Sequence, residues 1–237
     1  MRRANFEFGI YGWRFWKLLG LGLLSIVAAH VPGSAQVNTL NHSGPELTVR
    51  VHDSARVGSL LLSRASGEAG AVLRNAGIET VWIVCAESKV GFPGACHQTP
   101  AANELVLRIV RRAKATKRAP GCTQCGLAIE DDRGRGTYAT LYADCLDTRP
   151  QVDGLLPSQM LGYLIAHEIG HLLLTGQDHA SGGIMRPRIS DREWTMAVKG
   201  QLVFTSTQAE ALRGEIRTRV EEQRNLIQAG MPPGAKQ

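Results

Sequence analysis

The sequence predicts a single α/β domain that follows an N-terminal secretion signal. Three observations lead to this fold class. Several segments have the alternating or β-branched pattern of strands, a helical pattern lies between the first two of them, and two more helical patterns follow the last. The chain has 237 residues, of which 43% are hydrophobic and 20% charged. This composition suits one domain with a real core and leaves no obvious room for a second.

Residues 1–35 have the composition of a secretory signal peptide. Four basic residues and one acidic residue lie before an apolar run of about 14 residues, Leu18 to Val31. The run is shorter than the ~20 residues that span a bilayer, and the small residues Gly33 and Ala35 suit cleavage after Ala35. An uncleaved membrane anchor is the alternative. We expect a secreted or periplasmic protein with no stable membrane anchor after signal cleavage.

The domain is predicted to span residues 47–230, between a flexible lead at 36–46 and a disordered tail at 231–237. Apolar residues at helical spacing within Gly58–Gly77 predict a helix that backs the sheet. Together the segments predict a twisted mixed sheet of about five strands. The predicted strands are Leu47–His52, Thr80–Cys85, Glu104–Val110, Gly126–Ile129 and Thr137–Tyr142.

Two more helices are predicted in the C-terminal half. Pro157 suits a first helical turn, the apolar pattern continues to Leu173, and Gly176 is a natural C-terminal stop. Thr205 and Gln208 have the spacing of a capping box that opens the last helix. The stretch between these helices is expected to be irregular.

The charge of the chain does not indicate a nucleic-acid partner. Removing residues 1–35 lowers the formal net charge from +6 to +3, because the segment holds four basic residues and one acidic residue. The remaining basic cluster contains no aromatic residue on which a base could stack, so we predict no nucleic-acid binding. The cluster comprises Arg108, Arg111, Arg112, Lys114, Lys117 and Arg118.

All five cysteines follow the predicted signal, in a compartment where disulfides persist. Cys85 and Cys96 flank a short loop rich in glycine and proline, which favours a local disulfide. Cys145 could pair with either Cys122 or Cys125, which form a CxxC pair. The odd count leaves at least one thiol unpaired or intermolecular.

The helix that begins at Pro157 carries the residues that point to chemistry. His167 and His171 are four residues apart, so both imidazoles project from one side of the helix and can bind one metal ion. Glu168 points toward the open coordination position, where it can take a proton from the water that a zinc ion activates. This HExxH spacing indicates a zinc peptidase with Glu168 as the catalytic base. Two surface histidines are the alternative, but the apolar neighbours leave little room for a solvated face.

The third zinc ligand is expected after this helix. His179 has the better chemistry for zinc, and Asp178 beside it is a rival. Glu193 is a third candidate; otherwise it belongs to a charged helical turn packed by Trp194. The sequence leaves these alternatives open and favours His179.

The segment from His167 to Met185 resembles the metzincin clan of zinc endopeptidases. The clan pattern is HExxHxxGxxH, followed by a tight turn whose Met packs beneath the metal. The first three motif residues match directly, Gly176 and His179 are each displaced by two positions, and Met185 closes the turn. The resemblance implies a metzincin-like zincin fold, Zn²⁺ bound by His167, His171 and His179, and a peptide or protein substrate.

Two other groups of proteins bear on the interpretation. The stretch from His167 to Phe204 resembles an uncharacterised group of exported bacterial proteins, many from acidobacteria, with a HEIGHLLL helix and a Gly-Ile-Met-Arg turn. No substrate comes with that resemblance. In gluzincins the third ligand is a Glu on a following helix, which would assign Glu193.

The main hypothesis is an exported zinc-dependent endopeptidase. The alternatives are an exported zinc-binding module with a structural or interaction role, and a zinc amidase that acts on a cell-wall amide. Tyr142 and Tyr163 could in principle stabilise an oxyanion, but neither is needed as a catalytic residue. The sequence specifies neither a cleavage preference nor an oligomeric state.

Overall fold

The structure is a computed structural model that describes residues 44–85, 94–112, 124–148, 152–175 and 179–230. The chain divides into two units, residues 1–40 and 41–237, and every described residue belongs to the second. The predicted signal peptide and the C-terminal tail lie outside the described residues. Within the described part of the chain, no helix has the length and apolar character needed to cross a bilayer.

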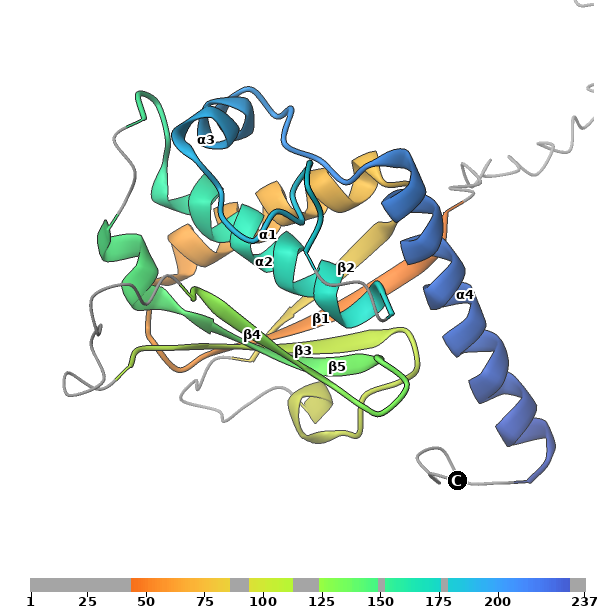
Figure 1. Ribbon diagram of the computed structural model, residues 1–237. Helices are drawn as coiled ribbons and strands as arrows, with labels where there is room; N and C mark the ends of the chain where they lie inside the picture. The colour runs from red at the N-terminus through yellow and green to blue at the C-terminus, as the bar shows by residue number, and fades with distance from the viewer. Residues whose placement is uncertain (1–43, 86–93, 113–123, 149–151, 176–178, 231–237) are drawn as a thin grey trace, which may run out of the picture. The chain divides into compact units, whose positions relative to one another are not determined.

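A five-stranded mixed sheet forms the centre of the domain, in the order β2-β1-β3-β5-β4 (Figure 1). Neighbouring strands run parallel except β4, which is antiparallel to β5. The predicted mixed sheet is therefore confirmed, with β2 and β4 at its edges. The strands are β1 (Glu46–Asp53), β2 (Glu79–Val84), β3 (Glu104–Val110), β4 (Gly126–Glu130) and β5 (Gly136–Tyr142).

Four α-helices among the described residues accompany the sheet, and two of them, α1 and α2, lie on the same face of it (Figure 1). Pro157 occupies the first turn of α2 as predicted. The predicted capping box also forms: Gln208 N donates to Thr205 Oγ1 at 3.3 Å, and Thr205 N donates to Gln208 Oε1 at 3.0 Å. The helices are α1 (Ser59–Asn75), α2 (Pro157–Leu173), α3 (Asp191–Val198) and α4 (Ser206–Gln228).

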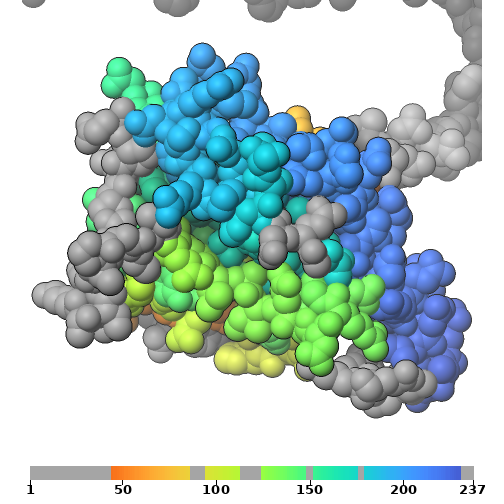
Figure 2. Space-filling model, in the orientation of Figure 1, coloured from red at the N-terminus to blue at the C-terminus, as the bar shows by residue number. Residues whose placement is uncertain are grey.

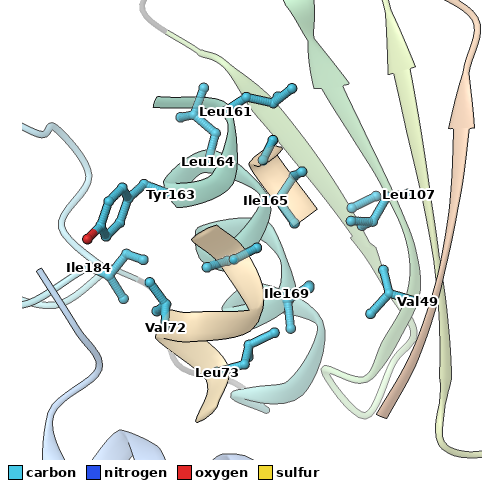
Figure 3. Close-up of a cluster of buried hydrophobic side chains, with 14 of the residues drawn as sticks. Val49, Val72, Leu73, Leu107, Leu161, Tyr163, Leu164, Ile165, Ile169 and Ile184 are labelled. Atoms are coloured by element: carbon cyan, nitrogen blue, oxygen red, sulfur yellow. The ribbon is translucent and has the colours of Figure 1, made fainter. Parts of the chain in front are cut away.

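The core lies between the sheet and these two helices (Figure 3). Strand alternation turns residues such as Val49 and Leu107 toward Ile165 and Ile169 of α2. Helix α2 crosses α1 at Gly162, where an added Cβ would lie 2.5 Å from the Cβ of Glu68. A larger residue there would separate the two helices. Helix α2 is therefore the central helix, and the HExxH motif is built into the core.

Helix α3 corrects the expectation of an irregular stretch before the last helix. Glu193 supplies a capping box for it, because its carboxylate accepts from the backbone N–H of Ser190 at 2.9 Å and from the Ser190 hydroxyl. Trp194 is buried and packs its ring edge-on against Tyr163. The Ser-x-x-Glu spacing is visible in the sequence. The structure confirms the alternative given for Glu193, a charged helical turn packed by Trp194.

The last helix ties the end of α2 to the sheet through one buried arginine. Arg219 of α4 donates to the carbonyl of Leu172 at 2.7 Å and to the carbonyl of Gly136 at 2.8 Å. Glu215 accepts from the same guanidinium at 2.8 Å. A cation at a helix C-terminus also interacts favourably with the helix dipole. Arg219 therefore fixes the end of the helix that carries the two histidines.

The two disulfides agree with the cysteine analysis. Cys85 pairs with Cys96 as predicted, and Cys145 pairs with Cys125, one of its two predicted partners. Cys122, the other predicted partner, lies outside the described residues. The second disulfide joins the residue just before β4 to the segment that follows β5.

Candidate metal centre

Helix α2 presents His167, Glu168 and His171 at its C-terminal end, as the HExxH spacing predicts. His167 and Glu168 are buried, and His171 is half-buried. The Nε2 atoms of the two histidines lie 3.1 Å apart. Two nitrogen ligands of one tetrahedral zinc ion at 2.0–2.1 Å would be separated by ~3.3 Å. The helix therefore holds the histidine pair at nearly the spacing that a shared ion requires.

His179 completes a group of three histidines. The nearest ligand atoms of His167, His171 and His179 all lie within 4.8 Å of one another. Among the described residues this is the group of histidine, cysteine and acidic side chains that could hold a metal ion. His179 is exposed, whereas the two helical histidines are partly or fully buried. The open side of the group therefore faces the solvent next to His179.

A backbone hydrogen bond orients the first histidine. His167 Nδ1 lies 2.8 Å from the carbonyl oxygen of Ile184, so Nδ1 carries the proton and Nε2 is left as the metal-binding nitrogen. Burial lowers the pKa of His167, which favours the neutral imidazole that can act as a ligand. Both effects prepare His167 for a metal.

The segment around Met185 supports the helix from below. Gly170 lies between the two helical histidines, and an added Cβ there would sit 2.3 Å from Met185 Sδ. Met185 is fully buried, and its carbonyl accepts from Ala180 N at 2.8 Å. Gly183 adopts a φ of 70°, a conformation that favours glycine, within this turn. The predicted tight turn is confirmed, and its Met packs against the helix between the two histidines.

Glu168 has a different environment from its histidine neighbours. Its carboxylate lies so close to strand β4 that a Cβ added at Gly126 would be 2.0 Å from Glu168 Oε1. No described residue forms a hydrogen bond or ion pair with it, and burial raises its pKa to about 8. A cation held by the histidines would favour the carboxylate and lower that pKa. Without a cation the buried carboxyl therefore holds its proton more tightly than an ordinary glutamate does.

The three histidines and Glu168 line one cleft of about 720 Å³. Strand β4 forms one wall, and residues 186–189 with Trp194 form the other. In the space-filling view the residues near 180–190, in cyan, lie beside the green residues of the β4–β5 hairpin (Figure 2). The apolar part of the cleft includes Met160, Leu164, Ile189 and Trp194.

The wall formed by β4 is anchored at its beginning by groups that the sequence did not single out for this role. The Cys125–Cys145 disulfide lines the cleft. Arg112 donates to Asp144 at 2.6 Å and to the carbonyl of Gln124 at 3.1 Å. Arg112 belongs to the basic cluster noted in the sequence. The spacing of that cluster does not indicate that Arg112 pairs with Asp144, 32 residues later. These contacts fix the strand that packs on Glu168.

The other predicted site residues have structural contacts or lie outside the description. Glu193 is held by Ser190 and Arg186 and is not a member of the histidine group. Asp178 and Gly176 lie outside the described residues. Tyr163 is buried and donates its hydroxyl to the carbonyl of Ala197 at 3.0 Å, so it serves the core. Tyr142 lies beneath the guanidinium of Arg112.

Comparison with models of protein families gives no match, and comparison with curated proteins gives none. Among solved structures, the chain is similar to archaemetzincin from Methanopyrus kandleri, with a TM-score of 0.45 and 17% identity over 73% of this chain and 96% of that one. It is also similar to a zinc-dependent peptidase from Methanocorpusculum labreanum (strain Z), with a TM-score of 0.43 and 16% identity over 69% of this chain and 99% of that one. At these levels of similarity, the role of each residue has to come from this chain's own geometry.

Proposed function

We propose that this protein is an exported zinc-dependent endopeptidase, with Zn²⁺ bound by His167, His171 and His179. The observation that carries the proposal is the convergence of three imidazoles and one buried carboxylate on a single open cleft. Three neutral nitrogen ligands with an open fourth position are typical of catalytic zinc sites. Glu193 is engaged as a helix cap, which weakens the gluzincin alternative.

Each residue has a distinct task in this mechanism. A zinc ion held by His167, His171 and His179 would supply Lewis acidity and would activate the attacking water. Glu168 accepts the proton of the attacking water and can return it to the leaving amine. The contact with Gly126 holds the Glu168 carboxylate at the cleft wall, where that proton transfer takes place. Ile184 keeps the His167 ring in the orientation that a ligand needs.

The form of the cleft favours an extended polypeptide as the substrate. Tyr142 N donates to the carbonyl of Cys125, so the backbone N–H and C=O groups of Cys125 point toward β5. Because these groups alternate along a strand, those of Gly126 and Ala128 point away from β5. Both line the cleft. No described residue pairs with the outward backbone groups of these two residues, so they can pair with a peptide laid along β4, next to Glu168. Such pairing binds the backbone of the peptide and suits cleavage within a chain.

Export is the second part of the proposal. The signal-like residues 1–35 support it, and the two disulfides are compatible with an oxidising compartment. Mass spectrometry of the mature protein should find Gln36 as the new N-terminus. An intact N-terminus in the membrane fraction would contradict this.

The alternatives differ in what they require of the site. A structural zinc site is usually closed by four protein ligands, whereas three histidines converge among the described residues. A structural module also has no need for an acid in a cleft. A cell-wall amide would use the same centre, so only substrate profiling separates an amidase from an endopeptidase.

The variant Glu168→Gln tests the proposed function. We expect it to keep about one zinc per chain and the native fold, and to lose ~10²–10⁴-fold in peptide hydrolysis, because the water has no proton acceptor. Zinc content by elemental analysis and cleavage of unbiased peptide libraries measure the two effects. Undiminished hydrolysis in the variant would refute the mechanism. Absence of cleavage by the zinc-loaded wild type, with cell-wall amides hydrolysed, would favour the amidase.

A further inference from the structure

The cleft wall opposite β4 carries an arginine whose charge is not balanced by any described residue. Two arginines of this wall line the cleft, Arg186 and Arg188. Arg186 donates to the carboxylate of Glu193, so its charge is already paired. Arg188 is exposed, and no described residue forms an ion pair or a hydrogen bond with its side chain. The cleft that holds the proposed metal centre therefore also presents one unpaired guanidinium.

The loop that carries this guanidinium is fastened at both ends to one carboxylate. We call residues 186–190 the arginine loop. Arg186 donates to Glu193, and Ser190 donates to the same carboxylate through its backbone N–H, at 2.9 Å, and through its hydroxyl. Glu193 is buried in the first turn of α3. Pro187 restricts the loop further, because its ring locks φ. The backbone of Arg188 is therefore held in place before a ligand arrives, which lowers the entropic cost of binding.

The arginine loop lies at the apolar end of the cleft. The loop is anchored beside Trp194, which packs its ring edge-on against Tyr163 on α2. Tyr163 lies about one helical turn before His167, so this end of the cleft is N-terminal to the HExxH motif. The apolar side chains that line the cleft from α2 and α3 are Met160, Leu164 and Trp194. A substrate side chain at this end meets both an apolar surface and a cation.

Apart from Glu168, the acidic residue that lines the cleft among those described is Glu130, and it lies toward the other end. Glu130 follows Gly126, the residue that contacts Glu168, by four positions on β4, which is ~13 Å along a strand. Its pairing partner Gly136 packs against Leu172, which follows the HExxH motif on α2. The charge of Glu130 is therefore too far away to balance the arginine loop.

We infer that Arg188 binds an acidic side chain of the peptide substrate, so that the cleft selects sequences with Glu or Asp near the cleaved bond. A guanidinium and a carboxylate form two parallel charge-assisted hydrogen bonds. The methylene groups of a glutamate can pack on the apolar surface at this end, which adds to the affinity. A neutral apolar side chain would use that surface and leave the arginine unpaired. The inference rests on the proposed function, because it names the substrate class of the same site.

Binding of capped peptides tests the inference without hydrolysis. The zinc-loaded Glu168→Gln protein keeps bound peptides intact. Two libraries of N-acetylated, C-amidated peptides are compared, identical except for one fixed position, which is Glu in the first and Gln in the second. We expect the Glu library to bind ~10-fold more tightly, because a hydrogen bond to a charged group contributes about that factor. Fluorescence anisotropy of labelled peptides measures both affinities. Tighter binding that requires a free C-terminus would assign a terminal carboxylate and overturn the proposal.

Variants of the arginine separate its charge from the rest of the cleft. In the same Glu168→Gln background, Arg188→Gln should abolish the preference for the Glu library. Arg188→Glu should reverse it, toward a third library with Lys at the fixed position. The control Arg192→Gln removes an exposed charge on α3 that does not line the cleft, and it should keep the ~10-fold preference. Equal binding of the Glu and Gln libraries before Arg188 is changed, or an undiminished preference in Arg188→Gln, would overturn the proposal.

Hydrolysis of the same libraries separates this inference from the proposed function. If the zinc-loaded wild type cleaves both libraries with equal kcat/KM, the endopeptidase stands and the role of Arg188 is refuted. If the wild type cleaves neither library, while the Glu168→Gln protein binds the Glu library through Arg188, the endopeptidase is refuted and the acidic binding site stands. Circular dichroism and zinc content establish that each variant is folded.

Discussion

Helix α2 and the segment His179–Met185 both contribute to the proposed metal centre, but different forces position them. Almost every residue of α2 is buried, so the core fixes the helix and its periodicity fixes His167 relative to His171. The segment is held by a few backbone hydrogen bonds, among them Ala180 N to Met185 O and Ile184 N to Val203 O. Its histidine is exposed. Two of the proposed ligands are therefore preorganised by the core, while the proposed third ligand depends on a turn.

The largest effect should follow removal of a helical ligand. We expect His167→Ala or His171→Ala to abolish tight zinc binding, because the remaining ligands cannot complete the site. Competition titration with a chelator measures the loss. Stoichiometric zinc in both variants would show that the metal binds elsewhere.

Removal of the third ligand should have a large but smaller effect. His179→Ala should weaken zinc by more than ~100-fold, beyond the effect typical of residues that only support a ligand. Glu193→Ala and Asp178→Ala serve as controls and should each change the affinity by less than ~100-fold. The same titration ranks the three variants. If Glu193→Ala were the most damaging, His179 would lose its assignment.

The wall beside Glu168 offers a test that leaves the ligands untouched. In Gly126→Ala the new methyl group would collide with the Glu168 carboxylate, so the acid must move. A displacement of about 1 Å at a reacting group can cost ~10²-fold in rate. We expect kcat to fall by about that factor while zinc affinity stays close to that of the wild type. Matched kinetics and zinc titration of this variant separate its effect from that of the ligands. Unchanged kcat would show that β4 does not position Glu168.

The smallest effect is expected at Met185. Met185→Leu nearly conserves volume beneath Gly170, so zinc should stay bound and the free energy of unfolding should fall by less than ~1.5 kcal/mol. Thermal or urea unfolding of the zinc-loaded protein measures this change in the free energy of unfolding. Loss of zinc in this variant would mean that the Met sulfur has a more direct role at the centre than packing.

The contrast between a helix with a local pattern and a turn held by distant contacts also explains how much of the fold and the site the sequence could predict. Strand alternation, helical spacing and a capping box are local patterns, and they located all five strands and the helices α1, α2 and α4. The contact of Gly126 with Glu168 joins segments far apart in the chain, and no local pattern indicates it. Helix α3 was expected only as a charged helical turn, one of two alternatives, because Glu193 fits both a metal ligand and a helix cap. His179 could be favoured by chemistry, but its approach to α2 depends on tertiary folding.

The buried guanidinium of Arg219 has a consequence for the order in which the site is completed. It lies 47 residues after Leu172, whose carbonyl it binds at the end of α2. A chain is synthesised from its N-terminus, so both histidines of the helix emerge before the arginine that caps it. Ribosome-bound chains that stop short of α4 therefore contain the whole HExxH motif without its clamp. The clamp can close only after the part of α4 that carries Arg219 has been synthesised.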